Sequence, residues 1–362
     1  MTTRQQGAGH GGPADSPRTD SELQRVAARA ASFPLRAGIV GAGIAGASCA
    51  GTLAAAGWEV DVYDKARGPG GRLSTKRLEE GWAALGSPFF SAKRDPFRSQ
   101  LREWARQGWL TPARGNILQG RATVSWAKAQ LQNHYLPSVQ PSQLVRQVLG
   151  SAHLHTQARV AAVQPRTIIL ENGEVKGNYD CVICSVPTPQ AIPMLDALPR
   201  LRERLVDIDY RPVWSFLMRW EGGPNADVIQ FDDHLLHLAV RQPFGGPGLY
   251  SVYATHEFSE TYLEASIEEA STRAASALMG LLGLPWPVEV ELSHRWRYAL
   301  PQTSVGGFWL GDRENRVALI GDGIAGPGVE RAWESGLRLA QALIQAREEL
   351  ARGEAVREAR LV

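Results

Sequence analysis

The chain has 362 residues, enough for one large or two ordinary domains. Its composition, with 44% hydrophobic and 21% charged residues, is typical of a folded globular protein. The formal net charge is only +2, so the chain lacks the excess of basic residues that is typical of nucleic-acid-binding proteins. Its three cysteines are too few for a disulfide framework. No apolar run approaches the ~20 residues that span a bilayer, so we expect neither a nucleic-acid nor a membrane partner.

Residues 1–34 are predicted to form a disordered N-terminal tail. The first twenty, MTTRQQGAGHGGPADSPRTD, are rich in Gly, Pro, Ser and charge. They contain no hydrophobic segment of the kind a signal peptide requires, and we expect a cytoplasmic location. Residues 21–32 are rich in Ala and Arg and favour a short helix leading into the domain.

Residues 35–64 have the order strand, glycine turn, helix, strand and acid. LRAGIV and WEVDVYD predict the strands, GAGIAG the turn, and ASCAGTLAAAG a closely packed helix. Gly41 allows a tight turn, Gly43 lets a pyrophosphate approach the backbone, and Gly46 lets helix and strand pack closely. The helix N-terminus favours phosphate, and Asp64 can accept hydrogen bonds from a ribose diol. This unit predicts a dinucleotide site.

A second glycine cluster, GPGGRLSTKR, begins at Gly68. Gly70 and Gly71 can bring backbone close to a pyrophosphate, and Arg72 supplies a cation with a planar fork of donors. The cluster predicts a further contact to the same cofactor.

The middle of the chain mixes element types. FRSQLREWARQGWL and TVSWAKAQLQNHYL are expected to form helices and loops. HLHTQARVAAVQPRTIILENGEVKGNYDCVICSVP predicts consecutive strands, with a hairpin turn at Asn172 and Gly173. DYRPVWSFLMRW, LLHLAV, GLYSVYATHEF and VEVELSHRWRYAL are strand-like, and SETYLEASIEEASTRAASALMGLLG predicts one helix among them.

Cys181 and Cys184 make a C-x-x-C within DCVICSVP, which a redox or zinc site would explain. However, the segment has the pattern of a buried strand, in which positions three apart point to opposite faces. The only other cysteine is Cys49, so no second pair completes a metal site. We expect a structural role for the motif and no metal.

The segment VALIGDGIAGPGVERAWESG predicts a strand, a glycine turn and a helix. Asp322 follows the strand, where a carboxylate can bind a sugar-chain hydroxyl, and the helix from about Val329 can face negative charge on a ring. A simple NAD enzyme has no need of a second such site, whereas FAD has an adenosine end and a ribityl-isoalloxazine end. The alternative is a segment that only completes the sheet.

These segments together resemble the FAD-dependent amine-oxidase-like superfamily and, within it, renalase-type enzymes. The hallmarks of the latter are a GGR-[ST]-T-x-R segment, an F-T-A-R-D-P-like segment, an RW-x-YA strand and a terminal GD…VE-x-A-x-x-SG helix. They stand here, in the family order, as GGRLSTKR, FFSAKRDP, HRWRYA and GDGIAGPGVERAWESG. The resemblance covers residues 35–346. It implies non-covalent FAD and oxidation of an isomeric dihydronicotinamide dinucleotide, with oxygen as the acceptor.

The expected fold is α/β, with a discontinuous Rossmann-like FAD-binding domain and an inserted substrate domain of mixed β-sheet and helices. The FAD-binding domain is predicted to comprise residues 35–80, 145–188 and 310–348, and the substrate domain residues 81–144 and 189–309. The predicted cofactor contacts are Gly41, Gly43, Ile44, Ala45, Gly46, Asp64, Lys65, Gly71, Arg72, Leu73, Val160, Gly321, Asp322, Gly328 and Val329.

The predicted catalytic residues are Ser91, Tyr253, His294, Trp296 and Tyr298. In SHRWRYA, the last three alternate with arginines, which predicts one aromatic and one cationic face of a strand. The aromatic face either stacks on a flat substrate or flavin, or packs into the core. Ser91 stands where the resemblance implies Thr, and its hydroxyl can reach flavin or substrate. Tyr253 stands where relatives often have His.

Departures from the family pattern put the substrate in doubt. The segment that resembles D-x-G-A-Q-Y is ALGSPFF, with Ala84 and Pro88 in place of the acid and the glutamine. Gly323 replaces a bulky residue near the flavin, which predicts a more open pocket. Two alternatives therefore stay open: an amine oxidase or carotenoid-precursor desaturase, and a nucleotide-binding protein that has lost catalysis.

Overall fold

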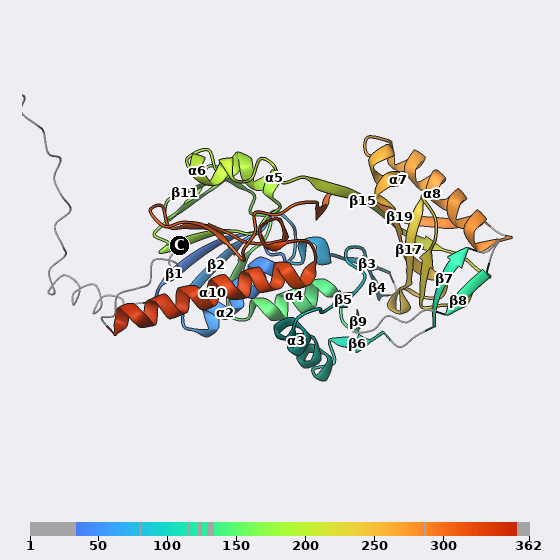
Figure 1. The fold of residues 1–362 in the computed structure, drawn as a ribbon, viewed down its shortest axis with the longest axis horizontal. Helices are drawn as coiled ribbons and strands as arrows, with labels where there is room; N and C mark the ends of the chain where they lie inside the picture. Colours follow the sequence, from blue (N-terminus) through green and yellow to red (C-terminus); the bar gives the residue numbers. More distant parts are fainter. Residues whose placement is uncertain are drawn as a thin grey trace, which may run out of the picture.

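The computed structural model describes residues 34–79, 81–113, 116–121, 125–128, 134–285 and 287–352. The N-terminal tail and the short helix predicted at residues 21–32 lie outside the described residues. Figure 1 shows an elongated molecule with a six-stranded sheet toward one end and a seven-stranded sheet toward the other. The α/β fold class with a Rossmann-like domain is confirmed.

The six-stranded sheet has the order β10-β2-β1-β14-β21-β20. Neighbouring strands from β10 to β21 run parallel, and β20 is antiparallel at the edge. Parallel strands buried on both faces need continuous apolar runs, and β1 and β14 have them. The strands are β1 (Arg36–Val40), β2 (Glu59–Tyr63), β10 (His153–His155), β14 (Cys181–Cys184), β20 (Leu310–Asp312) and β21 (Val317–Leu319).

Helices on one side of this sheet pack backbone against backbone. A Cβ on Gly336 would lie 2.1 Å from the Ala45 carbonyl oxygen, and one on Gly51 would lie 2.0 Å from the Val148 carbonyl oxygen. Glycine is therefore required where α10 and α4 cross α2. Figure 1 shows α10 lying along α2, with α4 and α3 beside them. The helices are α2 (Ile44–Ala55), α3 (Asp95–Arg106), α4 (Pro141–Leu149) and α10 (Val329–Ala351).

A three-stranded antiparallel sheet packs on the opposite face, where Ile168 and Tyr179 join a buried cluster with Val40 and Val182. The predicted hairpin turn is confirmed, since Gly173 has a φ of +85° and its N–H donates to the Leu170 carbonyl. The elements on this side are β11 (Val160–Gln164), β12 (Thr167–Leu170), β13 (Val175–Lys176), α5 (Thr188–Ala191), η2 (Ile192–Met194) and α6 (Pro199–Glu203).

The seven-stranded sheet has the order β19-β15-β18-β17-β16-β7-β8. The four strands predicted between residues 210 and 301 are confirmed, and β16 is an addition. The elements are β7 (Ile117–Arg121), β8 (Ser125–Lys128), β15 (Tyr210–Arg219), β16 (Val228–Phe231), β17 (Leu236–Arg241), η3 (Pro243–Gly245), β18 (Leu249–Ala254) and β19 (Glu289–Pro301), with α7 (His256–Thr261) and α8 (Ile267–Leu282) packed against them.

Two local predictions were wrong. The single helix expected between residues 259 and 283 is broken, because the Ser266 hydroxyl caps a new helix by accepting the Glu269 N–H at 3.1 Å. The segment TVSWAKAQLQNHYL contains strands and no helix in its described part, because β9 pairs with β5 and β6 from other parts of the chain. The small strands are β3 (Thr75–Leu78), β4 (Gly81–Ala84), β5 (Phe90–Ser91), β6 (Leu110–Pro112) and β9 (His134–Pro137).

The six-stranded sheet draws its strands from residues 36–63, 153–184 and 310–319, and the seven-stranded sheet from residues 117–128 and 210–301. This arrangement is what a discontinuous nucleotide-binding domain with an insertion requires. The domain boundaries given above stay a prediction.

The three cysteine thiols are buried, and burial raises the pKa of Cys181 to about 12 and that of Cys184 to about 11. We therefore expect no reaction of Cys49, Cys181 or Cys184 with a thiol reagent at pH 8 in the native protein, and reaction of all three in denaturant. Unfolded thiols lose their protons near pH 9.0, so the free energy of unfolding should fall from there to about pH 11 through Cys184 and to about pH 12 through Cys181. Rapid native labelling would contradict this structure.

Candidate functional site

The first glycine turn joins β1 to α2 and forms the floor of the candidate site. Gly41 has a φ of +101°, and its N–H donates to the Tyr63 carbonyl at 2.8 Å. A Cβ on Gly46 would lie 2.1 Å from the Gly41 carbonyl oxygen, so the helix can approach this closely only with glycine there. A Cβ on Gly43 would meet nothing within 4 Å, and α2 begins at Ile44 without a side-chain cap. An uncapped helix N-terminus beside open space suits a phosphate.

Asp64 braces this turn from the end of β2. Its carboxylate accepts the Ala42 N–H at 2.7 Å and the Ala66 N–H at 2.8 Å. The sequence analysis did not predict these two bonds. They leave the predicted role possible, because each carboxylate oxygen keeps a lone pair that can accept a ribose hydroxyl. Lys65 is exposed and donates to Gln190 at 3.3 Å.

The beginning of β11 lies beside this strand end. The Ala158 N–H donates to the Asp64 carbonyl at 2.9 Å, and Val160, two residues on, is buried. The structure therefore brings the predicted contacts Asp64 and Val160 into one region, although residues 64 and 160 lie far apart in sequence.

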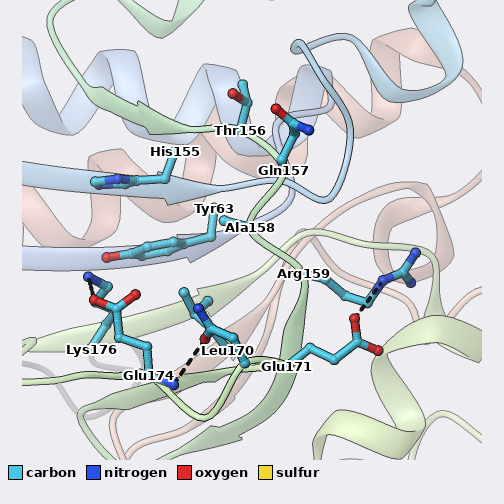
Figure 2. A pocket seen from close by; sticks show the side chains of 11 residues that line it. Tyr63, His155, Thr156, Gln157, Ala158, Arg159, Leu170, Glu171, Glu174 and Lys176 are labelled. Carbon is cyan, nitrogen blue, oxygen red and sulfur yellow. Dashed lines mark hydrogen bonds and ion pairs between the residues drawn. The ribbon is translucent and has the colours of Figure 1, made fainter.

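A cavity of about 390 Å³ adjoins this region (Figure 2). Tyr63 and His155 stack in it with ring centroids 4.6 Å apart, and Lys176 and Glu174 lie opposite. None of the predicted site residues lines it. Because Tyr63 immediately precedes Asp64, the cavity lies next to the predicted adenosine end of the cofactor site.

The second glycine cluster lies directly against the first. The Gly70 N–H donates to the Ala42 carbonyl at 2.9 Å, and Gly43 and Gly70 form a parallel bridge. Gly70 has a φ of +130°. The turn η1 (Gly71–Leu73) follows, with Leu73 buried in the core. Backbone from both clusters is thus adjacent, and a contact of the second cluster with the cofactor stays a prediction.

Arg72 and Asp322 form a bidentate ion pair. The two guanidinium nitrogens donate to the two carboxylate oxygens at 2.6 Å each, and the Arg72 side chain is 31% exposed against 6% for Asp322. Arg72 also donates to the Ala299 carbonyl in β19 at 2.8 Å. Arg72 therefore joins three chain segments. Its predicted role toward phosphate and that of Asp322 toward a hydroxyl stay predictions.

The glycine turn after β21 presents Asp322 and the start of α10. Gly321 has a φ of +123°, and its N–H donates to the Ser335 hydroxyl at 2.8 Å. Asp322 begins the short helix α9 (Asp322–Ala325). Gly328, with a φ of +104°, precedes α10, which begins at Val329 as predicted and has no side-chain cap.

The space beside Gly323 is not open, contrary to expectation. A Cβ on Gly323 would lie 2.5 Å from the Tyr210 hydroxyl and 2.8 Å from the Thr188 methyl carbon. Tyr210 comes from the start of β15, so a side chain distant in sequence fills the space that the glycine leaves. No local sequence signal identifies such a pairing.

The alternation predicted in β19 is confirmed. Arg297 forms a bidentate pair with Glu264 at 2.6 and 2.7 Å on one face. On the other, the rings of His294 and Trp296 lie 4.1 Å apart, and the Trp296 indole N–H donates to the Ser215 hydroxyl at 3.0 Å. Burial lowers the pKa of His294 below its usual 6.5, which favours the neutral ring.

Trp296 packs at the edge of a buried apolar cluster and Tyr298 lies at the Arg72 end of β19, where its carbonyl accepts from Arg72 at 3.4 Å. Trp296 thus packs partly into the core, which is one of the two alternatives given above. Tyr298 instead lies next to Arg72, one of the predicted flavin contacts.

Tyr253 is buried in β18, and its hydroxyl donates to the Gly86 carbonyl at 2.7 Å. Burial raises the pKa of this phenol. Ala84 is also buried, with its N–H bonded to Gln242 at 2.8 Å. The segment ALGSPFF is therefore held against the seven-stranded sheet, and the Tyr253 hydroxyl is engaged in holding it.

Ser91 is exposed in β5, and the residues after it are tied to α10. The buried Glu330 carboxylate accepts the Lys93 N–H at 3.0 Å and the Arg94 N–H at 2.7 Å. The sequence prediction missed Glu330. The sequence did contain a signal for it, because Glu330 is an acidic residue in the first turn of a helix that was predicted to border the site.

These features fit FAD. Two uncapped helix N-termini, of α2 and α10, border the glycine turns and the Arg72–Asp322 pair. The buried Thr188 hydroxyl beside Gly323 has no hydrogen-bond partner among the described residues, and a bound group would supply one.

The fold and the site define an FAD-dependent oxidoreductase. Residues 124–344 match the model of the family described as flavin containing amine oxidoreductase, and residues 39–104 match that of the NAD(P)-binding Rossmann-like domain. The first match covers more than half of the chain, so the chain belongs to the flavin containing amine oxidoreductase family. The predicted FAD cofactor is confirmed at the level of this family.

Solved structures share the fold at low identity. A fatty acid isomerase from P. acnes has a TM-score of 0.67 and 10% identity, covering 85% of this chain and 98% of its own. An oxidoreductase from Methanosarcina mazei has a TM-score of 0.65 and 12% identity, covering 85% and 100%. A redesigned putrescine oxidase has a TM-score of 0.64 and 13% identity, covering 86% and 100%. Among the described residues, no helix is long and apolar enough to cross a membrane.

Proposed function

We propose that this flavoprotein oxidises an isomeric dihydronicotinamide dinucleotide, with oxygen as the final acceptor. Held by the glycine turns and the Arg72–Asp322 pair, FAD would supply a two-electron acceptor for the hydride of the substrate, and oxygen with two protons would take up those electrons as hydrogen peroxide. The observation that carries the proposal is the Arg72 contact. Arg72 bonds Asp322 and also the Ala299 carbonyl, so the aromatic strand β19 is fastened to the cofactor-binding turns.

The residues of this chain would bind and orient the substrate. The ring of Tyr298 and the exposed part of Trp296 offer flat surfaces for a dihydronicotinamide ring. His294 beside them is neutral near pH 7, because its pKa is lowered, so it adds no charge next to the hydride donor. The backbone that follows Ser91 is held at the start of α10 through the bonds that Glu330 accepts from Lys93 and Arg94.

Anaerobic mixing tests the substrate directly. The purified protein is expected to be yellow, and the 2- and 6-dihydro isomers of NAD should bleach its absorbance near ~450 nm. Re-admitting oxygen should restore the colour and produce hydrogen peroxide. Ordinary 4-dihydro NAD is the matched control and should react more slowly. Bleaching by amines but not by the isomers would exclude the proposed substrate.

A second candidate is an amine oxidase. Membership of the flavin containing amine oxidoreductase family favours it. The same anaerobic panel, with a diamine and an aromatic amine included, separates it from the first. A protein that binds FAD and is bleached by none of these donors would instead favour a lost activity, for which Ala84 and Pro88 are the first positions to examine.

FAD binding is predicted to be non-covalent. All three cysteines are buried, and residues 304–308, SVGGF, contain no thiol. Heating or acid precipitation should therefore release all of the flavin into the supernatant, where its absorbance measures the released fraction. Flavin that stays with the precipitated protein would contradict the prediction.

A further inference from the structure

Tyr210 lies at the junction of the two sheets, where β15 begins. Figure 1 shows β15 extending from the neighbourhood of α5 into the seven-stranded sheet. The Tyr210 ring lies edge-on to the Tyr298 ring, with centroids 6.0 Å apart, and the Arg72 guanidinium carbon lies 5.9 Å from its centroid. Tyr210 therefore covers the cation that binds Asp322.

The Tyr210 hydroxyl occupies the space above Gly323. It lies 2.5 Å from where a Cβ of residue 323 would be, a separation that no real Cβ contact allows. Position 323 can thus carry a side chain only if Tyr210 and, to a smaller extent, the Thr188 methyl group move. A side chain at position 323 and the Tyr210 phenol therefore compete for the same space, although Tyr210 is in β15 and Gly323 is in α9.

A buried polar group without a partner lies beside this phenol. The Thr188 N–H points to the Tyr210 oxygen at 3.5 Å. The Thr188 hydroxyl is buried close to the same phenol and makes no hydrogen bond of normal geometry among the described residues. Leaving a buried hydroxyl without a good hydrogen bond is unfavourable, so a partner for it is expected in the working protein. Tyr210 and Thr188 thus present two hydroxyls next to the residue that follows Asp322.

We propose that Tyr210 is a positioning residue of the FAD site, which supplies from β15 the side chain that Gly323 lacks. Its ring holds the Arg72–Asp322 pair in place, and its hydroxyl, together with that of Thr188, gives bound cofactor a hydrogen-bonding edge. This inference rests on FAD as the cofactor and not on the proposed substrate.

FAD titration of four variants tests the pairing. Tyr210→Ala should weaken FAD binding about tenfold or more, and Tyr210→Phe, which keeps the ring, about threefold. Gly323→Ala in the wild-type background should weaken it about tenfold, because the added methyl displaces the phenol. In the Tyr210→Ala background the same substitution should weaken binding only about threefold or less, because the added methyl then meets only the Thr188 side chain.

Flavin fluorescence quenching gives the Kd, and the shape of the bound flavin spectrum gives an independent readout of positioning. Phe244→Ala removes a partly exposed ring that stacks on Trp82 and is the matched control, with an unchanged Kd expected. An equal penalty for Gly323→Ala with and without Tyr210 would overturn the inference, as would an unchanged Kd and spectrum in Tyr210→Ala. Wild-type protein that binds FAD but rejects every nicotinamide isomer would exclude the proposed substrate and leave this inference standing.

Discussion

Replacing Arg72 with alanine is expected to destabilise the protein and to weaken FAD binding more than any other single charge removal at the site. The substitution leaves the buried Asp322 carboxylate without its partner and frees β19 from the glycine turn. Breaking a largely buried pair of this kind costs about 2–4 kcal/mol of unfolding free energy. Urea denaturation without added flavin measures that loss, and flavin titration measures the affinity, for which we expect a drop of at least about tenfold.

Two further variants test whether loss of the Arg72–Asp322 ion pair causes the predicted fall in stability and in FAD affinity. Asp322→Asn in the Arg72→Ala background should restore part of the stability, since a neutral amide needs no counter-charge. Arg297→Ala removes an equally bidentate arginine, but its Glu264 partner is exposed, so only a small change is expected. If Arg297→Ala were as damaging as Arg72→Ala, the role assigned to the buried pair would be wrong.

Gly336→Ala is expected to be strongly destabilising, because it adds a methyl group where two helices cross. The new Cβ would lie 2.1 Å from the Ala45 carbonyl oxygen, so α10 must move away from α2. Overpacking of this kind costs about 1–3 kcal/mol or more. The displaced helices are the two whose N-termini border the candidate site, so FAD affinity should fall together with the melting temperature.

The same substitution at Gly280 is the control. Gly280 is exposed in α8, and a Cβ there would meet nothing within 4 Å. Gly280→Ala should therefore stabilise the protein by about 0.5–1 kcal/mol, through higher helix propensity. Thermal unfolding of the two variants should move in opposite directions, and destabilisation by both would show that the cause is not the crossing of α2 and α10.

The parts that could be predicted from sequence depend on local chemistry. Gly41 and Gly46 are required by backbone geometry within a single turn, and α10 begins at Val329 because a glycine turn precedes it. The consecutive positions of β19 alternate between faces because a strand has a period of two residues. Such features need only neighbouring residues, and the motif order then led to the flavin family.

The parts that could not be predicted depend on contacts between distant segments. The residues of β9 have no strong strand signal, and they pair because β5 and β6 reach them. Tyr210 fills the space at Gly323 only because β15 begins beside α9. Glu330 binds backbone of the Ser91 segment from another element altogether. The roles of the individual site residues stay predictions that the variants above test.

The Arg72–Asp322 pair joins residues 250 positions apart in the chain, and β20, β21 and α10 follow the whole seven-stranded sheet in sequence. During synthesis the glycine turns emerge from the ribosome long before Asp322 does. A nascent chain that has reached the end of β19 therefore has an Arg72 without its carboxylate and an α2 without the helix that covers it. The candidate site is therefore complete only after the last strand and the last helix of the described chain have been made.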